Sequence, residues 1–267
     1  MEIFGYIASL FIGISLGLVG AGGSILTVPV MVYLFHIPVM AATSYSLFIV
    51  GATSLMGACY QVKQDHVNGK VAITFSLVSL TMVFLVRYFV LPGIPPQLFV
   101  ISGVAISYSL ISMLLFSMLM ILASRAMIRK KQQDGADTNA EHSMMRLLLY
   151  GLLVGLITGF LGAGGGFILI PALVLLLGFT MKDAIGTSLL IIAINSLFGF
   201  ALDMGHILID WQLLLIITGM ATGGLVLGIA AGKNISAKKL KISFGWMIML
   251  AGIMIMVKEL AGFFTSY

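Results

Sequence analysis

Long apolar stretches separated by short polar ones run along almost the whole chain. They fall at about 3–19, 25–36, 39–60, 71–91, 97–123, 146–161, 167–180, 184–202, 211–231 and 242–265. Several of them exceed the roughly 18 to 20 apolar residues with which a helix crosses a bilayer of about 30 Å. The pattern therefore predicts an all-α polytopic membrane protein.

Composition supports the same class. Of the 267 residues, 60% are hydrophobic and 9% are charged, and the mean hydropathy is +1.16. A soluble domain has no place for so much apolar surface, because its exterior must face water. The net charge of +5 suits lysines and arginines that orient helices in a membrane, so we expect the lipid bilayer as a partner and no nucleic acid.

Two glycine clusters interrupt the apolar stretches at equivalent places. The first lies in GLVGAGGSILTVP (17–29) and the second in GFLGAGGGFILIP (159–171). At this fixed offset, about 15 of 41 positions in 17–57 and 159–199 are identical, which indicates an internal repeat. Because each glycine costs roughly 1 kcal/mol inside a helix, the clusters predict a helix break in both halves.

One strongly polar stretch, SRAMIRKKQQDGADTNAEHSMMR (124–146), divides the chain. It is too polar to cross lipid, and its composition is typical of a flexible loop. The sequence thus predicts a first membrane repeat (1–123), a polar cytoplasmic linker (124–145) and a second membrane repeat (146–267).

The broken first segment of each half either crosses the membrane once or folds back as a hairpin. A continuous helix over 3–35 would be about 50 Å long, well beyond the hydrocarbon core. A single crossing would also place the basic loop 233–241 outside and the acidic turn 203–210 inside, against the positive-inside rule. With hairpins, every lysine and arginine except Arg87 and Lys258 lies in the cytoplasm.

Charge therefore favours two glycine-broken hairpins, each followed by three transmembrane helices, with the two repeats inverted. Inverted repeats with broken helices are a common transporter architecture. The protein is then a multi-pass protein of the cell (inner) membrane, with both chain ends outside and the central loop cytoplasmic. A single crossing stays open as the alternative, since charge alone favours the hairpins.

The glycine breaks also predict a binding site. A broken helix within a membrane exposes backbone N–H groups and the positive end of a helix dipole, and these must face protein or water. Two inverted hairpins would bring two such ends together near the midplane, where a small anion can bind without a lysine or arginine. The predicted substrate-binding residues are Gly20, Gly22, Gly23, Ser24 and Ser46 in the first half, and Gly162, Gly164, Gly165, Gly166, Thr187, Ser188 and Asn195 in the second.

These residues also have a structural interpretation. Glycines often serve close helix packing, and serine or threonine hydroxyls often cap helices or bond to carbonyls of their own helix. Arg87 lies near the end of its apolar stretch and is expected to snorkel outward. Asp203 is the one carboxylate near a helix end that could couple to protons. His66 and His206 are expected to be interfacial loop residues.

Several stretches resemble the sulfite exporter TauE/SafE family, also called the toluene sulfonate uptake permease group. They are the two GxxGAGG hairpins followed by proline, AATSYSLF (41–48), DAIGTSLL (183–190) and GMATGGLVLGIAAGKNISAKKLKISFGWMIMLAG (219–252). The first half departs from the pattern, because LTMVFLVRYFVLPGIPPQ (80–97) stands where the glycine-rich helix would be. The resemblance implies a membrane protein that moves sulfite, sulfonates or other organosulfur anions.

The leading hypothesis is a secondary transporter of a small anion, sulfite or an organosulfonate, that works by alternating access. An anion channel and a non-transporting membrane partner subunit are the alternatives. An enzyme is not expected, because the sequence contains no HExxH, no GxSxG and no lysine after either glycine cluster. Neither a metal nor a cofactor is predicted, and the sequence does not choose between a monomer and a homodimer.

Overall fold

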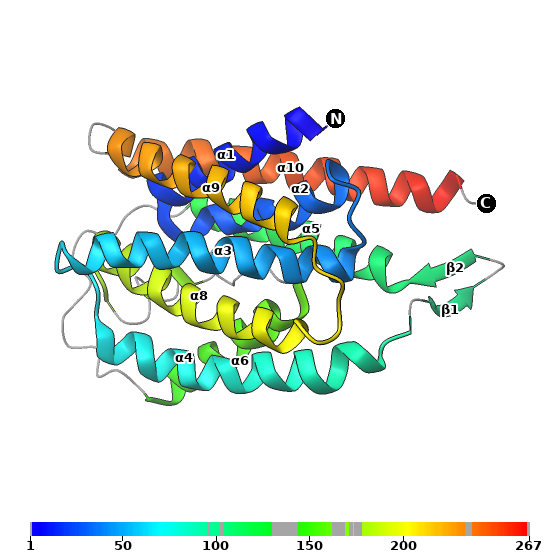
Figure 1. The fold of residues 1–267 in the computed structure, drawn as a ribbon, viewed down its shortest axis with the longest axis horizontal. Helices are drawn as coiled ribbons and strands as arrows, with labels where there is room; N and C mark the ends of the chain where they lie inside the picture. Colours follow the sequence, from blue (N-terminus) through cyan, green and yellow to red (C-terminus); the bar gives the residue numbers. More distant parts are fainter. Residues whose placement is uncertain are drawn as a thin grey trace.

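The computed structural model consists almost entirely of helices, which confirms the all-α membrane fold (Figure 1). It describes residues 2–95, 97–101, 104–129, 144–161, 169–170, 173, 178–232 and 237–265. The first half contains α1 (Glu2–Val19), the 3-10 helix η1 (Gly20–Leu26), α2 (Thr27–Tyr33), α3 (Val39–Val62), α4 (Gly69–Phe84), the π-helix η2 (Leu85–Val90), the 3-10 helix η3 (Leu91–Gly93), β1 (Gln97–Ile101), β2 (Val104–Ser107) and α5 (Tyr108–Arg129). The second half contains α6 (Met144–Leu161), α8 (Met181–Asp203), α9 (Trp211–Gly232) and α10 (Ala237–Thr265).

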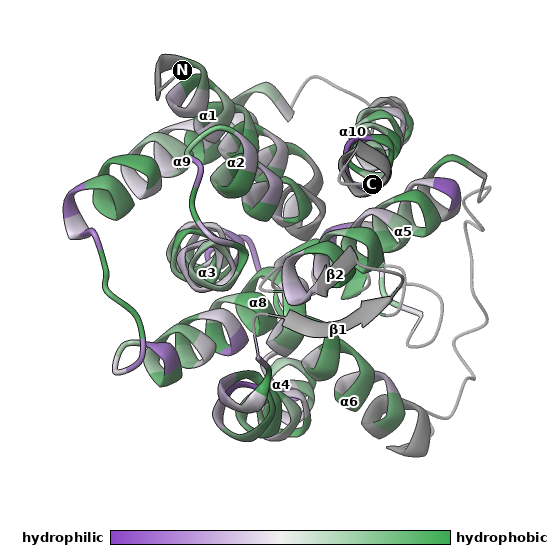
Figure 2. Ribbon diagram, turned by 90° about the vertical axis from the view of Figure 1, so that its right-hand side faces the viewer, coloured by the Kyte–Doolittle hydropathy of each residue, from purple (hydrophilic) through white to green (hydrophobic). Residues whose placement is uncertain are grey.

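Large apolar side chains are exposed on the outside of the bundle as well as buried in its core, and Figure 2 shows that hydrophobic residues predominate along most of the helices. Leu77 on α4 and Leu250 and Met254 on α10 are among those exposed. Because so much contiguous apolar surface is not kept in water, this exterior is the lipid-facing surface of a multi-pass membrane protein. Five described helical stretches are long and apolar enough to span the bilayer, namely Val39–Val62, Gly69–Gly93, Tyr108–Arg125, Lys182–Asp203 and Trp211–Gly232.

The first glycine cluster breaks the helix as predicted. α1 ends at Val19, Gly20 has a φ of +72°, and the chain continues as η1 before α2 begins. Glycine is the residue that adopts this left-handed conformation without steric cost. After α2 the chain has returned to the start of α1, because the ring of Phe35 packs edge-on against that of Tyr6, with 5.6 Å between the centroids. This segment is therefore a hairpin.

The turn of this hairpin lies near one end of the bundle. A Cβ on Gly20 would stand 2.6 Å from the side chain of Ile185, in the second turn of α8, and a Cβ on Gly232, at the end of α9, would stand 3.4 Å from Leu18. The sequence predicts a break nearer the midplane. The difference arises because the 18 residues of α1 already extend about 27 Å, close to a full crossing. The second cluster, 162–166, lies outside the described residues.

Contacts between the two halves come in pairs that share the repeat offset, which carries Gly20 to position 162. A side chain on Gly13 of α1 would overlap the carbonyl oxygen of Ala221 in α9. A side chain on Gly155 of α6 would overlap the carbonyl oxygen of Ser79 in α4. The repeat offset carries Gly13 to Gly155 and Ser79 to Ala221, so the same close backbone contact is made twice, each time between different halves.

The equivalent helices α3 and α8 pack against each other in opposite directions (Figure 1). Leu47, near the start of α3, lies against Gly199, near the end of α8, and Leu189, near the start of α8, lies against Gly57, near the end of α3. Leu47 corresponds to Leu189 and Gly57 to Gly199 in the repeat. The missing glycine side chains provide the space for the leucine methyl groups, so one leucine–glycine pair is formed near each end of the contact.

A short antiparallel hairpin, β1 with β2, occupies the start of the stretch that the apolar pattern predicts as one segment over 97–123. Pro95 and Pro96 precede it, and proline both disfavours a helical residue before it and cannot donate a backbone hydrogen bond. The prolines therefore separate this hairpin from the preceding helix, and α5 starts at Tyr108. Figure 1 shows this hairpin at the same end of the bundle as the N-terminus and the turn between α8 and α9.

Candidate functional site

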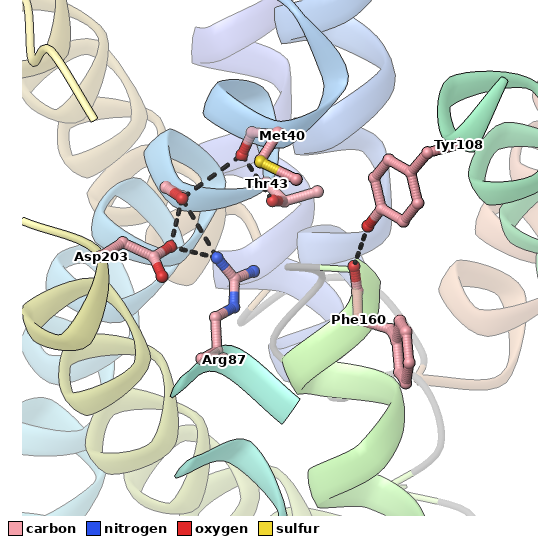
Figure 3. A network of polar contacts seen from close by, with 7 residues as sticks. Met40, Thr43, Arg87, Tyr108, Phe160 and Asp203 are labelled. Atoms are coloured by element: carbon pink, nitrogen blue, oxygen red, sulfur yellow. Dashed lines mark hydrogen bonds and ion pairs between the residues drawn. The ribbon is translucent and has the colours of Figure 1, made fainter. Parts of the chain in front are cut away.

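A buried ion pair joins the two halves of the chain (Figure 3). Arg87 lies in η2 and Asp203 is the last residue of α8. The Nη1 group of Arg87 donates to Asp203 Oδ2 and to the hydroxyl oxygen of Ser44 in α3 at 3.1 Å, and the Ser44 hydroxyl donates to the same carboxylate. Arg87 is only 3% exposed and Asp203 8%. Three helices, α3, α4 with its η2 extension, and α8, therefore converge on one charged cluster.

The expectation that Arg87 snorkels outward is wrong. Snorkelling assumes a cation near a helix end with no partner inside the protein, whereas Asp203 supplies the counter-charge here. The helix also changes form at this point, since residues Leu85–Val90 are a π-helix. Such widened turns are rare and are frequently found at functional sites. Charged groups inside a transmembrane bundle are likewise costly and mark functional positions by default.

Arg87 uses only one of its three nitrogen atoms in this cluster. Within the described part of the chain, its Nε and Nη2 groups are buried and have no hydrogen-bond partner. Together they form one edge of the planar guanidinium, the edge that faces away from Nη1. Tyr108 lies across the guanidinium from Asp203 in the view of Figure 3, with its hydroxyl donating to the carbonyl oxygen of Phe160 at 3.4 Å. A buried donor without an acceptor costs about 1–3 kcal/mol, more when charged.

A second set of buried polar groups follows the contact between α3 and α8. The hydroxyls of Ser46, Ser54 and Ser196 are buried and have no hydrogen-bond partner among the described residues. Asn195 donates from Nδ2 to the Ser79 hydroxyl at 2.7 Å, while its Oδ1 has no partner there. The repeat relates Ser54 to Ser196 and Ser46 to Ser188. Hydrogen-bonding capacity is thus left over on both helices of the repeat pair.

The remaining predicted site residues lie in different surroundings. Ser188 is buried and donates to the carbonyl oxygen of Ile185 in its own helix at 2.9 Å, and the Thr187 hydroxyl accepts the backbone N–H of Asn68 at 3.0 Å. Both lie in the first turns of α8, at the opposite end from Asp203. Ser24 is buried within η1. Gly22 and Gly23 also belong to η1, and Gly162, Gly164, Gly165 and Gly166 lie outside the described residues.

The end of the bundle opposite Arg87 carries its own polar contacts. His66 Nδ1 lies 3.0 Å from Asp183 Oδ1, with both side chains partly exposed. These two residues line a pocket of about 530 Å³ between the α3–α4 loop and the residues that precede α8. His66 lies in the loop between α3 and α4, and it has a partner in the other half of the chain. In the described ranges, no three His, Cys, Asp or Glu side chains come together as metal ligands.

Sequence reasoning missed the cluster of Arg87, Asp203 and Ser44. One signal was present, because Arg87 is a charged residue inside a strongly apolar stretch, 71–91. The repeat gave no help, since the positions equivalent to Arg87 and Asp203 are Ile229 and Gln61. The pair therefore belongs to one end of the molecule and has no counterpart of the same chemistry at the other.

Comparison with known proteins gives the chain its family. The family described as sulfite exporter TauE/SafE matches residues 6–255. A probable membrane transporter protein of Xylella fastidiosa (strain 9a5c) is 27% identical over 257 residues, 94% of this chain and 93% of the relative. The probable membrane transporter protein MJ0441 of Methanocaldococcus jannaschii is 25% identical over 94% of both chains. YdhB of Bacillus subtilis, another probable membrane transporter protein, is 25% identical over 68% of this chain and 70% of its own length.

No solved structure matches the chain. The family match covers nearly all of it, from the first hairpin to the last helix. Together with the apolar exterior and the five candidate spans, these relationships place the chain in the TauE/SafE sulfite exporter family, as a multi-pass membrane transporter.

Proposed function

We propose that this protein is a secondary transporter of a small oxyanion, sulfite or an organosulfonate, which works by alternating access. The observation that carries the proposal is the set of buried serine hydroxyls at the contact between α3 and α8 that have no hydrogen-bond partner among the described residues (Ser46, Ser54 and Ser196). Each such group costs about 1–3 kcal/mol when it stays unpaired. A transported anion with several acceptor oxygens removes this cost as it passes the hydroxyls.

Alternating access needs two related halves that swap roles, and we propose that the two repeats are inverted relative to each other. The backbone N–H of Asn68 donates to the Thr187 hydroxyl at 3.0 Å, and the backbone N–H of Asp210 donates to the Tyr45 hydroxyl at 2.6 Å. The repeat offset carries Asn68 to Asp210 and Tyr45 to Thr187. Equivalent bonds at opposite ends of an antiparallel helix pair are what a two-fold axis in the membrane plane requires.

The glycine breaks complete the proposed path. Gly20, Gly22, Gly23 and Ser24 in the first half, with Gly162, Gly164, Gly165 and Gly166 in the second, offer backbone N–H groups to an anion without placing bulky side chains in its way. Ser46, Thr187, Ser188 and Asn195 are the side chains that we assign to the same path. Both repeats, 1–123 and 146–267, contribute to this path, and the linker 124–145 joins them.

The test is anion flux into liposomes that contain the purified protein. Sulfite, methanesulfonate, thiosulfate and sulfate are offered separately, and saturable, gradient-driven uptake of sulfite or the sulfonate is the expected result. Unsaturable flux that follows voltage alone would show a channel instead. Gly23→Leu and Gly165→Leu are expected to abolish uptake. Gly219→Leu is the matched control, because no other atom lies within 4 Å of a Cβ at Gly219.

If all four anions stay outside the vesicles, the substrate class is wrong. If both break variants transport like the wild type, the glycines serve only helix packing and the proposed path is wrong.

A further inference from the structure

We propose that Arg87 and Asp203 form an oxyanion site that takes up its anion together with one proton. The inference rests on the proposed function and goes beyond it, because it names the charged residues of the site and the coupling ion. The ligand class is a small sulfur oxyanion with at least two free oxygens on one face.

The geometry of Arg87 supplies the anion site. Its Nε and Nη2 groups are the two donors of one guanidinium edge, both are buried, and neither has a partner among the described residues. A guanidinium edge donates two parallel hydrogen bonds, which match two oxygens of a sulfite or sulfonate group. The other side of the guanidinium is held by Asp203 and Ser44. The free edge is therefore fixed in direction before any ligand arrives, which lowers the entropy cost of binding.

The charge balance supplies the proton. As it stands, the cluster is neutral, because the positive charge of Arg87 is matched by Asp203. An anion on the free edge would leave a net negative charge inside the bundle, where charge is poorly screened. Protonation of the Asp203 carboxylate restores neutrality. The proton resides on a carboxylate oxygen, the ion pair becomes a hydrogen bond between the charged guanidinium and a neutral carboxyl group, and the positive charge of Arg87 is balanced by the anion.

The other titratable groups near the cluster have separate roles. Tyr108 on α5 faces the guanidinium from the far side and is engaged with the Phe160 carbonyl. His206 follows α8, and its backbone N–H donates to the carbonyl oxygen of Asp203, but the residue is exposed. Asp203 is the titratable group in direct contact with the Nη1 group of Arg87. The proton that accompanies the anion is therefore assigned to Asp203.

The cluster also gives the transport cycle an asymmetry that the repeat lacks. Ile229 and Gln61 stand at the equivalent positions, so the repeat does not place a second arginine–aspartate pair at the equivalent point of the other end. The proposed site therefore takes up one proton with each anion that it binds.

The experiment measures anion binding to the purified full-length protein by its thermal stabilisation across a pH series. Methanesulfonate is the main probe, because its charge stays constant over the range, and sulfite is the second. In the wild type we expect affinity to rise as the pH falls, by up to about tenfold per pH unit, as the uptake of one proton requires. Asp203→Asn, which mimics the protonated carboxyl, is expected to bind with no pH dependence.

Two Arg87 variants test the edge itself. Arg87→Lys keeps a charge for Asp203 but lacks the two-donor edge, and the affinity for methanesulfonate is expected to fall at least about tenfold. Arg87→Gln combined with Asp203→Asn avoids an unpaired buried charge, and this double variant is expected to fold and not to bind. Asp183→Asn, at the other end of the same helix, and His206→Gln are the controls, and both are expected to keep the wild-type pH dependence.

The outcomes separate the two proposals. Arg87→Lys with wild-type affinity overturns the anion site, and Asp203→Asn with the wild-type pH slope overturns the proton. Wild-type protein that no probe anion stabilises overturns both parts. Arg87-dependent, pH-linked stabilisation without any flux of sulfite or sulfonate supports the site and overturns the proposed transport function.

Discussion

The hydroxyl of Tyr45 in α3 accepts a hydrogen bond of 2.6 Å from the backbone N–H of Asp210, the residue before α9. Its repeat equivalent, Thr187 in α8, accepts the N–H of Asn68, the residue before α4, at 3.0 Å. Asn68 and Asp210 also cap the helices that follow them, through bonds from Val71 and Leu213. Each end of the bundle thus has a loop fastened to the central helix of the other half.

These two bonds can be broken one at a time. Tyr45→Phe removes the acceptor for Asp210, and Thr187→Val removes the acceptor for Asn68. Loss of about 1 kcal/mol is expected to speed hydrogen exchange about fivefold in the affected loop and to leave the other loop unchanged. Mass spectrometry of residues 203–211 and 62–69 measures both. Equal acceleration of both loops by either variant would show that the two ends do not open independently.

The tight backbone contacts predict strong effects of very small substitutions. Gly13→Ala and Gly155→Ala would press a methyl group into the carbonyl oxygens of Ala221 and Ser79. Overpacking of this kind costs about 1–3 kcal/mol, so the thermal unfolding temperature in detergent is expected to fall in both. Gly223→Ala in α9 is the control, because no other atom lies within 4 Å of its Cβ position, and alanine stabilises a helix by up to about 1 kcal/mol.

The hairpin turn combines two constraints at Gly20. An alanine at this position would have to adopt a φ of +72°, which destabilises the folded state by about 1–2 kcal/mol. Its Cβ would also stand 2.6 Å from the side chain of Ile185. Gly178→Ala separates the two effects, since Gly178 has a φ of +64° and no neighbour within 4 Å. We expect Gly20→Ala to lower the free energy of unfolding more than Gly178→Ala does. The addition of Ile185→Ala to Gly20→Ala is expected to recover part of the difference in the same unfolding assay.

Two serines at equivalent positions are expected to differ in transport. The Ser46 hydroxyl has no partner in the described part of the protein, whereas Ser188 donates to the Ile185 carbonyl. A hydroxyl that is free to bind the anion contributes more than one already engaged in its helix. Ser46→Ala should therefore raise the KM for anion uptake by roughly fivefold, the equivalent of about 1 kcal/mol, while Ser188→Ala changes it little. The reverse order would remove Ser46 from the path.

The orientation in the membrane can be read from two exposed loop residues. In a Cys59→Ser background, Leu208→Cys is expected to react with a membrane-impermeant maleimide on intact cells, and Asp65→Cys only after the cells are made permeable. Leu208 is 98% exposed, and Asp65 lies in the exposed α3–α4 loop. The expectation follows from the basic residues that flank Asp65, Lys63 and Lys70. Reaction of both on intact cells contradicts the inverted topology.

The repeat offset was the most informative property of the sequence. It related Leu47 to Leu189 and Gly57 to Gly199 before any contact was known, because similar sequences fold into similar local structures. The glycine cluster after Val19 predicted the break, since glycine at φ +72° has no low-cost substitute. The helical class followed from apolar stretches long enough to span lipid.

The Arg87–Asp203 pair was beyond the reach of the same reasoning. Its members are 116 positions apart, and they meet only because α4 and the end of α8 pack on α3. The repeat gave no indication of the pair, because the equivalent positions are occupied by the uncharged residues Ile229 and Gln61. The position of the first hairpin turn near one end of the bundle was also missed. A run of glycines shows where a helix breaks in the sequence, but it does not show how far across the membrane the preceding helix extends.

The close contacts at Gly13 and Gly155 have a consequence for how the protein is assembled. They leave no clearance between α1 and α9, or between α6 and α4, so each of these helix pairs can only move as one body. Each body takes one helix from the first half of the chain and one from the second. The mechanical parts of the protein are therefore not its two sequence halves, and neither half expressed alone would contain a complete moving part. A gene cut within the linker would have to deliver both fragments to the same membrane before either helix pair could form.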